Sequence, residues 1–97
     1  MFCHEVMMKF EEGYLNEETL RNAREKAKAI QEKLDFTSEV RIVCNCVERD
    51  INYDMLLQAV MDDASNLPVY LSDPVHQSLW NDLKAHVVAK AAIDYIR

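Results

Sequence analysis

Polar and apolar residues alternate at the start of the chain in the manner of a β-strand. Every second residue from position 2 to position 10 shares one face: Phe2, His4, Val6, Met8 and Phe10. The residues between them form the other face: Cys3, Glu5, Met7 and Lys9. A period of two is the period of a strand, so the pattern predicts a strand over residues 2–10. His4 is the one polar member of an otherwise apolar face.

A helical period replaces this alternation after Gly13. Asn16 is a favourable N-cap, and the two glutamates that follow it suit the positive end of a helix dipole. Apolar residues then recur at helical spacing with charges between them: Leu20, Ala23, Ala27, Ile30 and Leu34. The pattern predicts an amphipathic helix over residues 16–35.

Two more strands are expected over residues 39–48 and 53–61. Each has a face of apolar or thiol side chains: Val40, Ile42, Cys44 and Cys46 in the first, and Met55, Leu57, Ala59 and Met61 in the second. The polar segment 48–52 between them has the length of a hairpin loop. We therefore expect an antiparallel pair.

The last third of the chain predicts two helices. Ser65 can cap a short helix that runs through Tyr70. Asp73 followed by Pro74 is a strong start for the next helix, because an acidic cap precedes a proline at the first helical position. This helix is expected to end near His86.

A final strand is expected over residues 88–96, and it completes the order β-α-β-β-α-α-β. This order predicts an α+β, ferredoxin-like fold with a four-stranded antiparallel sheet and helices on one face. We place four residues of this strand beneath the helices: Ala89, Ala91, Ile93 and Tyr95. The open face then mixes charged residues with apolar ones: Cys3, Met7, Val43, Val47, Leu56, Val60, Ala92 and Ile96. A half-apolar face suits a protein interface, so the sequence predicts a homodimer.

Composition narrows the function classes. The chain has 97 residues, 49% of them hydrophobic, which predicts a single domain over residues 1–97. The net charge of -6 argues against nucleic acid and anionic membranes as partners. No apolar run is long enough to span a bilayer, and the first residues lack the pattern of a signal peptide. We therefore expect a cytoplasmic protein with reduced thiols.

The chain resembles the stress-responsive dimeric α/β barrel (Dabb) family. The resemblance rests on the element order, on the early His4 and on the segment Tyr70-Leu71-Ser72-Asp73-Pro74-Val75-His76, followed by a helix and a strand that closes with Asp94-Tyr95. The family pattern is close to Tyr-x-x-His-Pro-x-His, and Asp73 replaces its first histidine. The resemblance implies a dimer whose two sheets face each other as a barrel, with a cavity between sheet and helices.

The resemblance also implies a chemistry. Olivetolic acid cyclase-type polyketide cyclases use such a cavity for an aldol-type ring closure, with a Tyr and a His spaced as Tyr70 and His76 are, and a pocket His where this chain has His4. A further pocket His of these cyclases corresponds to Met55, which puts that particular reaction in doubt. Many members of the family have no assigned reaction, so the resemblance carries the fold better than the function.

The candidate site residues support two hypotheses. His76 lies in the first turn of a helix, where the dipole favours a neutral imidazole that can act as a base, and Tyr70 could orient it or donate to an oxyanion. Alternatively, the pair is a hydrogen bond that pins two helices, and His4 is a satisfied core residue. Met55 and Trp80 could line a hydrophobic pocket or simply fill the core.

The sequence therefore predicts a homodimer with a pocket for a small hydrophobic molecule and no assignable reaction. The alternative is a cofactor-free cyclase, isomerase or lyase that acts on a hydrophobic keto compound with His76 and Tyr70. No metal site is expected, because Cys44 and Cys46 match no zinc spacing and lie on an edge strand away from His4. No cofactor is expected either, since a single glycine cannot supply a phosphate-binding loop.

Overall fold

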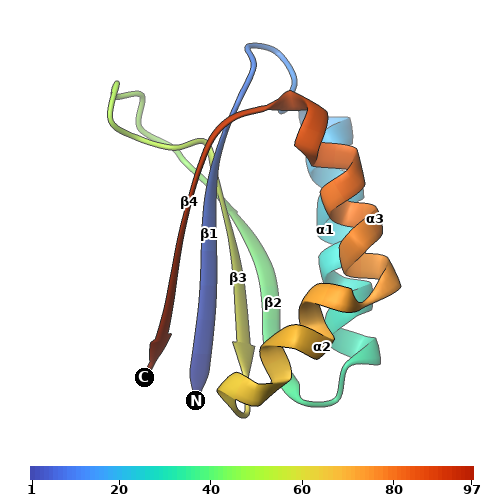
Figure 1. Cartoon of the computed structure of the whole chain (residues 1–97). Helices are drawn as coiled ribbons and strands as arrows, with labels where there is room; N and C mark the ends of the chain where they lie inside the picture. The colour runs from blue at the N-terminus through green and yellow to red at the C-terminus, as the bar shows by residue number, and fades with distance from the viewer.

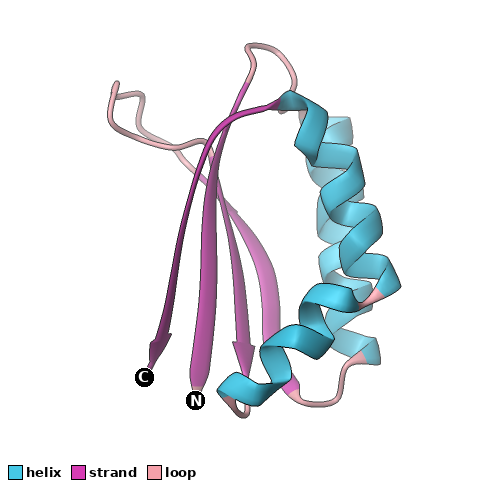
Figure 2. Ribbon diagram, in the orientation of Figure 1, coloured by secondary structure: helices cyan, strands magenta, loops and turns pink.

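The computed structural model describes residues 1–97 and has two layers, a sheet and the helices that cover one of its faces (Figure 1). The elements follow one another as β1 (Phe2–Phe10), α1 (Glu17–Lys33), β2 (Thr37–Cys44), β3 (Met55–Met61), the 3₁₀ turn η1 (Ala64–Asn66), α2 (Leu67–Ser72), α3 (Pro74–Leu83), the 3₁₀ turn η2 (Lys84–His86) and β4 (Val87–Ile96). The sheet is antiparallel with the order β2-β3-β1-β4, and all helices lie on one side of it (Figure 2). The predicted α+β, ferredoxin-like fold is confirmed.

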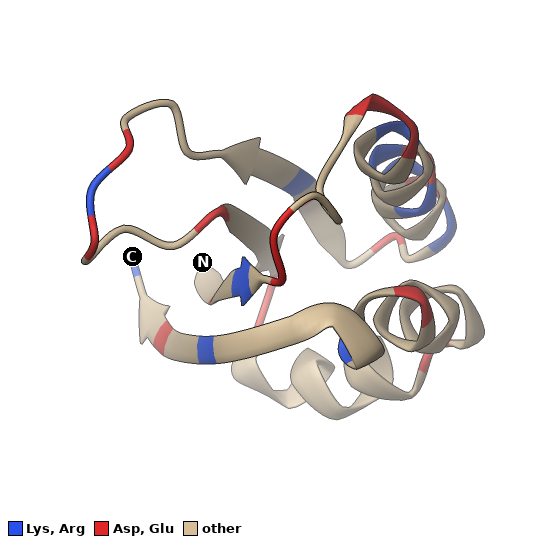
Figure 3. Cartoon of the chain, turned by 90° about the horizontal axis from the view of Figure 1, so that it is seen from above, with Lys and Arg blue, Asp and Glu red and all other residues tan.

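The core lies between the two layers. The even-numbered residues of β1 face the helices, as the alternation predicted. The helix side of β3 contains Met55, Leu57, Ala59 and Met61. α1 covers the β2 side of the sheet with a stripe of small and apolar residues that includes Ala23, Ala27 and Ile30. Its charged residues point outward and mix both signs, so that no basic patch forms there (Figure 3).

The N-terminus of α1 forms as expected, through a capping box. The Asn16 side chain accepts a hydrogen bond from the Thr19 backbone N–H at 3.0 Å, and the Thr19 hydroxyl accepts one from the Asn16 backbone N–H at 2.9 Å. Two backbone donors at the helix start are satisfied in this way. The helix ends at Lys33, slightly earlier than position 35.

The hairpin between β2 and β3 opens earlier than the sequence predicted. β2 was expected over 39–48 but ends at Cys44, so Cys46 lies in the loop rather than on the strand. The Asn45 side chain donates to the Val47 carbonyl at 2.7 Å, and Asn52 donates to the same carbonyl at 3.0 Å. These side-chain contacts replace the strand ladder and widen the loop to residues 45–54.

The short helical segment begins before the predicted cap. Asp63, not Ser65, is the capping residue, because its carboxylate accepts the Ser65 backbone N–H at 2.9 Å. The segment then continues through α2 to Ser72, beyond the expected end at Tyr70.

Asp73 separates α2 from α3 and holds the helix layer together. Its carboxylate accepts the backbone N–H groups of Val75 at 2.9 Å and His76 at 3.1 Å, as expected of an N-cap. It also pairs with Lys33 at the end of α1, and its side chain is only 2% exposed. Burial alone would raise the pKa of Asp73, but the Lys33 ammonium and the two N–H groups outweigh it and hold the pKa below its ordinary value.

The faces of β4 are the reverse of those predicted. Asp94 pairs with His4, Ala92 with Val6 and Lys90 with Met8, so these β4 residues lie on the helix side. The residues predicted to lie beneath the helices, Ala89, Ala91, Ile93 and Tyr95, lie on the open face instead. Hydrophobic periodicity points the other way, because both charges of the strand, Lys90 and Asp94, fall on the set that the structure turns toward the helices. Lys90 and Asp94 are tolerated on the helix side because β4 is an edge strand, where both stay partly in solvent.

We predict that Asp73→Ala lowers the free energy of unfolding by about 1–2 kcal/mol, the usual contribution of an N-cap side chain. Asp73→Asn should lose less stability, because the amide oxygen can still accept hydrogen bonds from the backbone N–H groups. Urea unfolding followed by circular dichroism measures both. The matched control is Asp63→Ala, which removes an exposed cap from the short turn η1 and should change the midpoint less. An equal loss of unfolding free energy in the two alanine variants would show that burial and Lys33 add nothing to the stability contributed by Asp73.

The same contact predicts a pH dependence. Because the folded pKa of Asp73 is lowered, its contribution to stability is present above the unfolded value of about 4. It is lost as the pH falls through the folded pKa. The wild type should therefore lose more stability than Asp73→Asn between neutral pH and about pH 3.

Candidate functional site

A cavity of about 280 Å³ lies between the helix layer and the β1, β3 and β4 strands. The sheet contributes six lining residues: His4, Val6, Met8, Leu57, Lys90 and Ala92. The helices contribute five: Leu71, His76, Leu79, Trp80 and Leu83. Eight of these eleven residues are hydrophobic, which is typical of a small-molecule pocket.

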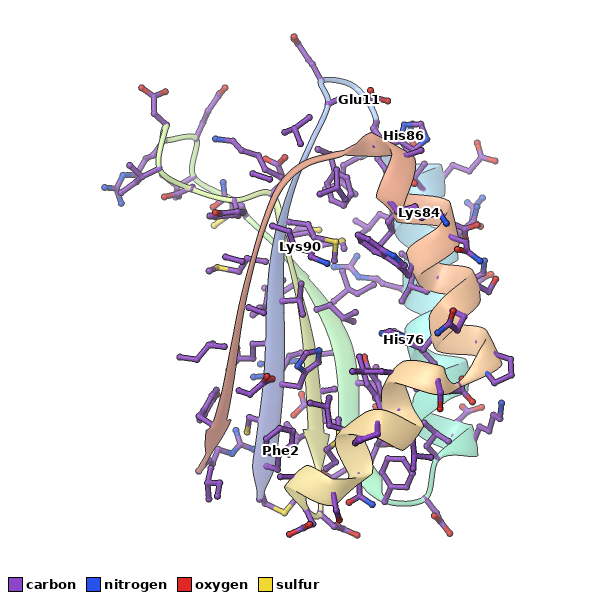
Figure 4. All side chains as sticks on the ribbon, viewed as in Figure 1. Phe2, Glu11, His76, Lys84, His86 and Lys90 are labelled. Carbon is purple, nitrogen blue, oxygen red and sulfur yellow. The ribbon has the colours of Figure 1, made fainter.

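The polar residues of the cavity are His4, His76 and Lys90, and none of the lining residues is acidic. Figure 4 shows His76 on the helix layer and Lys90 on β4, across the space between the two layers. The polar side chains of this wall are therefore two imidazoles and one ammonium.

His4 is held in one orientation by its neighbour on β4. It is 8% exposed, and its Nδ1 is hydrogen-bonded to the Asp94 carboxylate on the paired residue of β4. An ionised carboxylate only accepts, so Nδ1 carries the proton and donates. When the ring is neutral, Nε2 is left as the acceptor.

His76 is oriented by the end of α2. Its Nδ1 lies 3.2 Å from the Leu71 carbonyl oxygen, which only accepts, so Nδ1–H is the donor and Nε2 carries the free lone pair. Burial is the largest influence on this imidazole and lowers its pKa, and the nearby His4 lowers it further. The Leu71 carbonyl and Asp73 oppose this shift without cancelling it. His76 is therefore a neutral imidazole at neutral pH, with an available base nitrogen.

Tyr70 packs against both imidazoles. Its ring centroid lies 4.6 Å from that of His76 and 5.9 Å from that of His4. The side chain is fully buried and is not part of the cavity wall. Its hydroxyl has no hydrogen-bond partner, and burial, with Asp73 nearby, raises its pKa well above the ordinary value. An unpaired buried hydroxyl costs free energy, so this group stands out in the fold.

The structure therefore brings His4, Tyr70 and His76 together, but it does not place the Tyr70 hydroxyl against His76 as a hydrogen-bonded pin. Trp80 also lines the cavity. Met55 does not. It is 2% exposed in the core, and it borders a separate hollow on the other side of the sheet.

The residues of this region that the sequence-based site lacked include Lys90, Ala92 and Asp94. All three lie on β4, whose faces were assigned in reverse. The Lys90 ammonium lies 4.3 Å from the centroid of the Trp80 ring. One signal could have located them, because an acidic residue opposite a buried histidine favours the register that pairs His4 with Asp94.

A second aromatic cluster lies at the other end of the helix layer (Figure 4). His86 is bonded to the Glu11 carboxylate and stacks on Tyr14 with ring centroids 3.9 Å apart. Tyr14 in turn donates to the Asp82 carbonyl at 3.0 Å. These contacts join the loop after β1 to the end of α3, and they border no part of the cavity described above.

Two further features bear on the chemistry. No group of three or more His, Cys, Asp or Glu side chains is close enough together to hold a metal ion. None of the helices combines the length and the apolar character needed to cross a membrane.

Comparison with known proteins places the chain among ferredoxin-like structures. No protein-family model matches it, and no curated protein matches its sequence. A dimeric protein of unknown function with a ferredoxin-like fold from Bacteroides fragilis is 18% identical with a TM-score of 0.82, and the match covers 99% of this chain and 95% of that one. A Dabb family protein from Mesorhizobium loti is 16% identical with a TM-score of 0.74, over 99% and 95% of the two chains.

A hydroxynitrile lyase from Passiflora edulis is also similar, with 9% identity and a TM-score of 0.78 over 99% of this chain and 92% of that one. At these identities the similarities establish the fold alone. They agree with the architecture described above, and they leave the chemistry of the cavity to be argued from its own residues.

Proposed function

We propose that this protein is a homodimer that binds a small hydrophobic molecule in the cavity between its sheet and its helices. The observation that carries the proposal is the cavity itself. Its wall is mostly apolar, and its imidazoles have their Nδ1 atoms already engaged. Such a wall combines an apolar surface for affinity with a few fixed polar groups for orientation.

The open face of the sheet supports the dimer. With the observed register, this face contains Met7, Val43 and Ile93, which are exposed apolar residues of three different strands. A hollow of about 460 Å³ adjoins it beneath the loop 45–54, and most of its lining is hydrophobic. Exposed apolar surface of this kind favours association with a partner. The similar protein from Bacteroides fragilis is described as dimeric, which supports a second copy of this chain as that partner.

The family resemblance extends the proposal. The similarity to a Dabb family protein supports assignment to the stress-responsive dimeric α/β barrel proteins. A single domain over residues 1–97 and a cytoplasmic location, both expected from the sequence, belong to the same proposal.

A second candidate function is acid–base catalysis on a hydrophobic keto compound, as a cofactor-free lyase, isomerase or cyclase. The observation that favours it is His76, a neutral base at the cavity wall, packed against a tyrosine whose buried hydroxyl has no partner. His76 Nε2 would take the α-proton of the ligand, and the C–H electron pair would pass into an enolate. The Tyr70 hydroxyl, kept neutral by its raised pKa, is not part of the cavity wall, so it would donate to the enolate oxygen only after the ligand displaces the side chains between them. The similarity to a hydroxynitrile lyase agrees with this class of chemistry.

Filling the cavity should weaken binding. Ala92 lines it at the edge of the sheet, so Ala92→Phe places a ring in the cavity and should weaken the binding of a neutral probe such as octanamide by on the order of tenfold. The fluorescence of Trp80, the only tryptophan, reports the titration. Ala85→Phe, in the exposed turn η2, is the control and should bind as the wild type does. Undiminished binding by Ala92→Phe would locate the ligand elsewhere.

A charge on the open face should separate the dimer. Ile93 is 59% exposed there, and Ile93→Glu would bury a carboxylate without a partner in the interface. Sedimentation equilibrium should find a dimer for the wild type and a monomer for this variant. Val69→Glu makes the same change on α2, at a residue that is 52% exposed on the helix layer, and should remain dimeric. A dimer that survives Ile93→Glu and dissociates with Val69→Glu would place the interface on the helices.

The catalytic candidate makes a paired prediction for Tyr70 and His76. Tyr70→Phe should raise the free energy of unfolding by about 1 kcal/mol, because it removes an unpaired buried hydroxyl. The same change should slow deuterium exchange at the α-carbon of an apolar β-keto ester, and His76→Gln should abolish it. The exchange rate is measured by NMR, with the rate in the absence of protein subtracted.

The lowered pKa of His76 sets the pH profile of this exchange. The wild-type rate should hold as the pH falls through about 6.5, the ordinary histidine value, and decline only below it. If the wild type and His76→Gln exchange deuterium at the same rate, the catalytic function is rejected and only the binding function remains.

A further inference from the structure

The ligand class is indicated by Lys90, a charged residue of the cavity wall that the sequence-based site lacked. Resting on the proposed binding function, we propose that the cavity selects a hydrophobic monocarboxylate, with the Lys90 ammonium as the anchor for its carboxylate. The proposal adds a specificity-determining residue and a charge to a ligand that the cavity alone describes only as small and apolar.

The charge balance of the wall favours an anion. The wall contains His4, His76 and Lys90 and no acidic residue, although the chain as a whole carries a net charge of -6. The nearest acidic group on the same strand, Asp94, is already bonded to His4 and is not part of the lining. A carboxylate entering the cavity therefore meets the Lys90 ammonium as a charged donor, and the one neighbouring carboxylate is engaged.

Lys90 is free to bind. The ion pairs of the chain involve Lys26, Lys28, Lys33, Arg41, His4 and His86, and Lys90 takes part in none of them. Its one polar contact is with the face of Trp80, at 4.3 Å from the ring centroid. A cation–π contact at an exposed site is weaker than a charge-assisted hydrogen bond to a carboxylate. A ligand carboxylate can therefore recruit the ammonium without displacing an ion pair.

The contact with Trp80 also explains how Lys90 is positioned. The residue lies on the edge strand β4 and is partly in solvent, while its stem crosses toward the helices (Figure 4). Resting on Trp80 keeps the ammonium at the mouth of the cavity. The apolar part of the wall, with Met8, Leu79 and Leu83, is buried more deeply and suits the hydrocarbon part of the ligand. The arrangement matches an amphipathic monoanion, with its charge at the mouth and its chain inside.

The test compares two probes of the same size and shape, octanoate and octanamide, by titration of Trp80 fluorescence. The wild type should bind octanoate about tenfold more tightly than octanamide, the factor expected of one charge-assisted hydrogen bond. Lys90→Met keeps the apolar stem over Trp80 and should lose this preference while it still binds octanamide. Lys90→Arg keeps the charge and should retain the preference.

Lys84→Met is the matched control. It makes the same substitution and the same change of net charge at an exposed helix-layer lysine that does not line the cavity (Figure 4). It should keep the full preference for octanoate, and circular dichroism should find all variants folded. Raising the salt concentration should reduce the preference of the wild type, because the anchor is partly in solvent.

The outcomes separate this inference from the function on which it rests. Equal affinity of the wild type for the two probes, or a preference that survives Lys90→Met, would overturn the anchor and leave the binding function standing. If the wild type binds neither probe, both the Lys90 anchor and the binding function are overturned. Loss of the preference in Lys84→Met as well would assign it to net charge, which also overturns a specific role of Lys90.

Discussion

The helix layer depends on one buried carboxylate. Asp73 ends α2, caps α3 through two backbone N–H groups and pairs with Lys33 of α1, so it joins three helices at a single point. Tyr70 precedes it by one helical turn, and His76 follows it in the first turn of α3. The break at Asp73 turns the chain so that the two rings pack together at 4.6 Å. The geometry of the site thus follows from a helix cap.

The site also depends on the register of an edge strand. In a strand, a shift of one residue exchanges the two faces, so the pairing of β4 with β1 decides which residues meet the helices. The observed register brings Asp94 to His4 and Lys90 to Trp80. It also leaves Ile93 and Ala91 on the open face, which becomes more apolar than the opposite register would make it. One register therefore shapes both the cavity and the surface proposed for the dimer.

The cavity wall and the tyrosine behind it carry features that packing alone would not favour. A fully buried tyrosine hydroxyl without a partner and a desolvated imidazole both lower the stability of the folded chain. Such groups are concentrated at functional sites. By contrast, His86 is bonded to Glu11 and stacked on Tyr14, which accounts for its polar and aromatic surface.

Much of this protein follows from its sequence because the relevant signals are local. The alternation in residues 2–10, the helical stripe after Asn16 and the Asp73-Pro74 start each specify an element through neighbours close in the chain. The proximity of His4, Tyr70 and His76 follows from that element order and from the spacing around the helix break. The end of β2 at Cys44 was less accessible, because side-chain hydrogen bonds from Asn45 and Asn52 compete there with the ladder.

Only the tertiary structure decided the faces of β4, and with them the cavity wall. Within residues 87–96 both charges fall on even-numbered positions and the odd-numbered residues are apolar or aromatic, so hydrophobic periodicity places the odd face toward the core, opposite to the observed register. The choice is made by pairing with β1, by the partners Asp94 and Lys90 find across the layers, and by solvent at the sheet edge. These are contacts between residues far apart in the chain, and a local pattern cannot encode them.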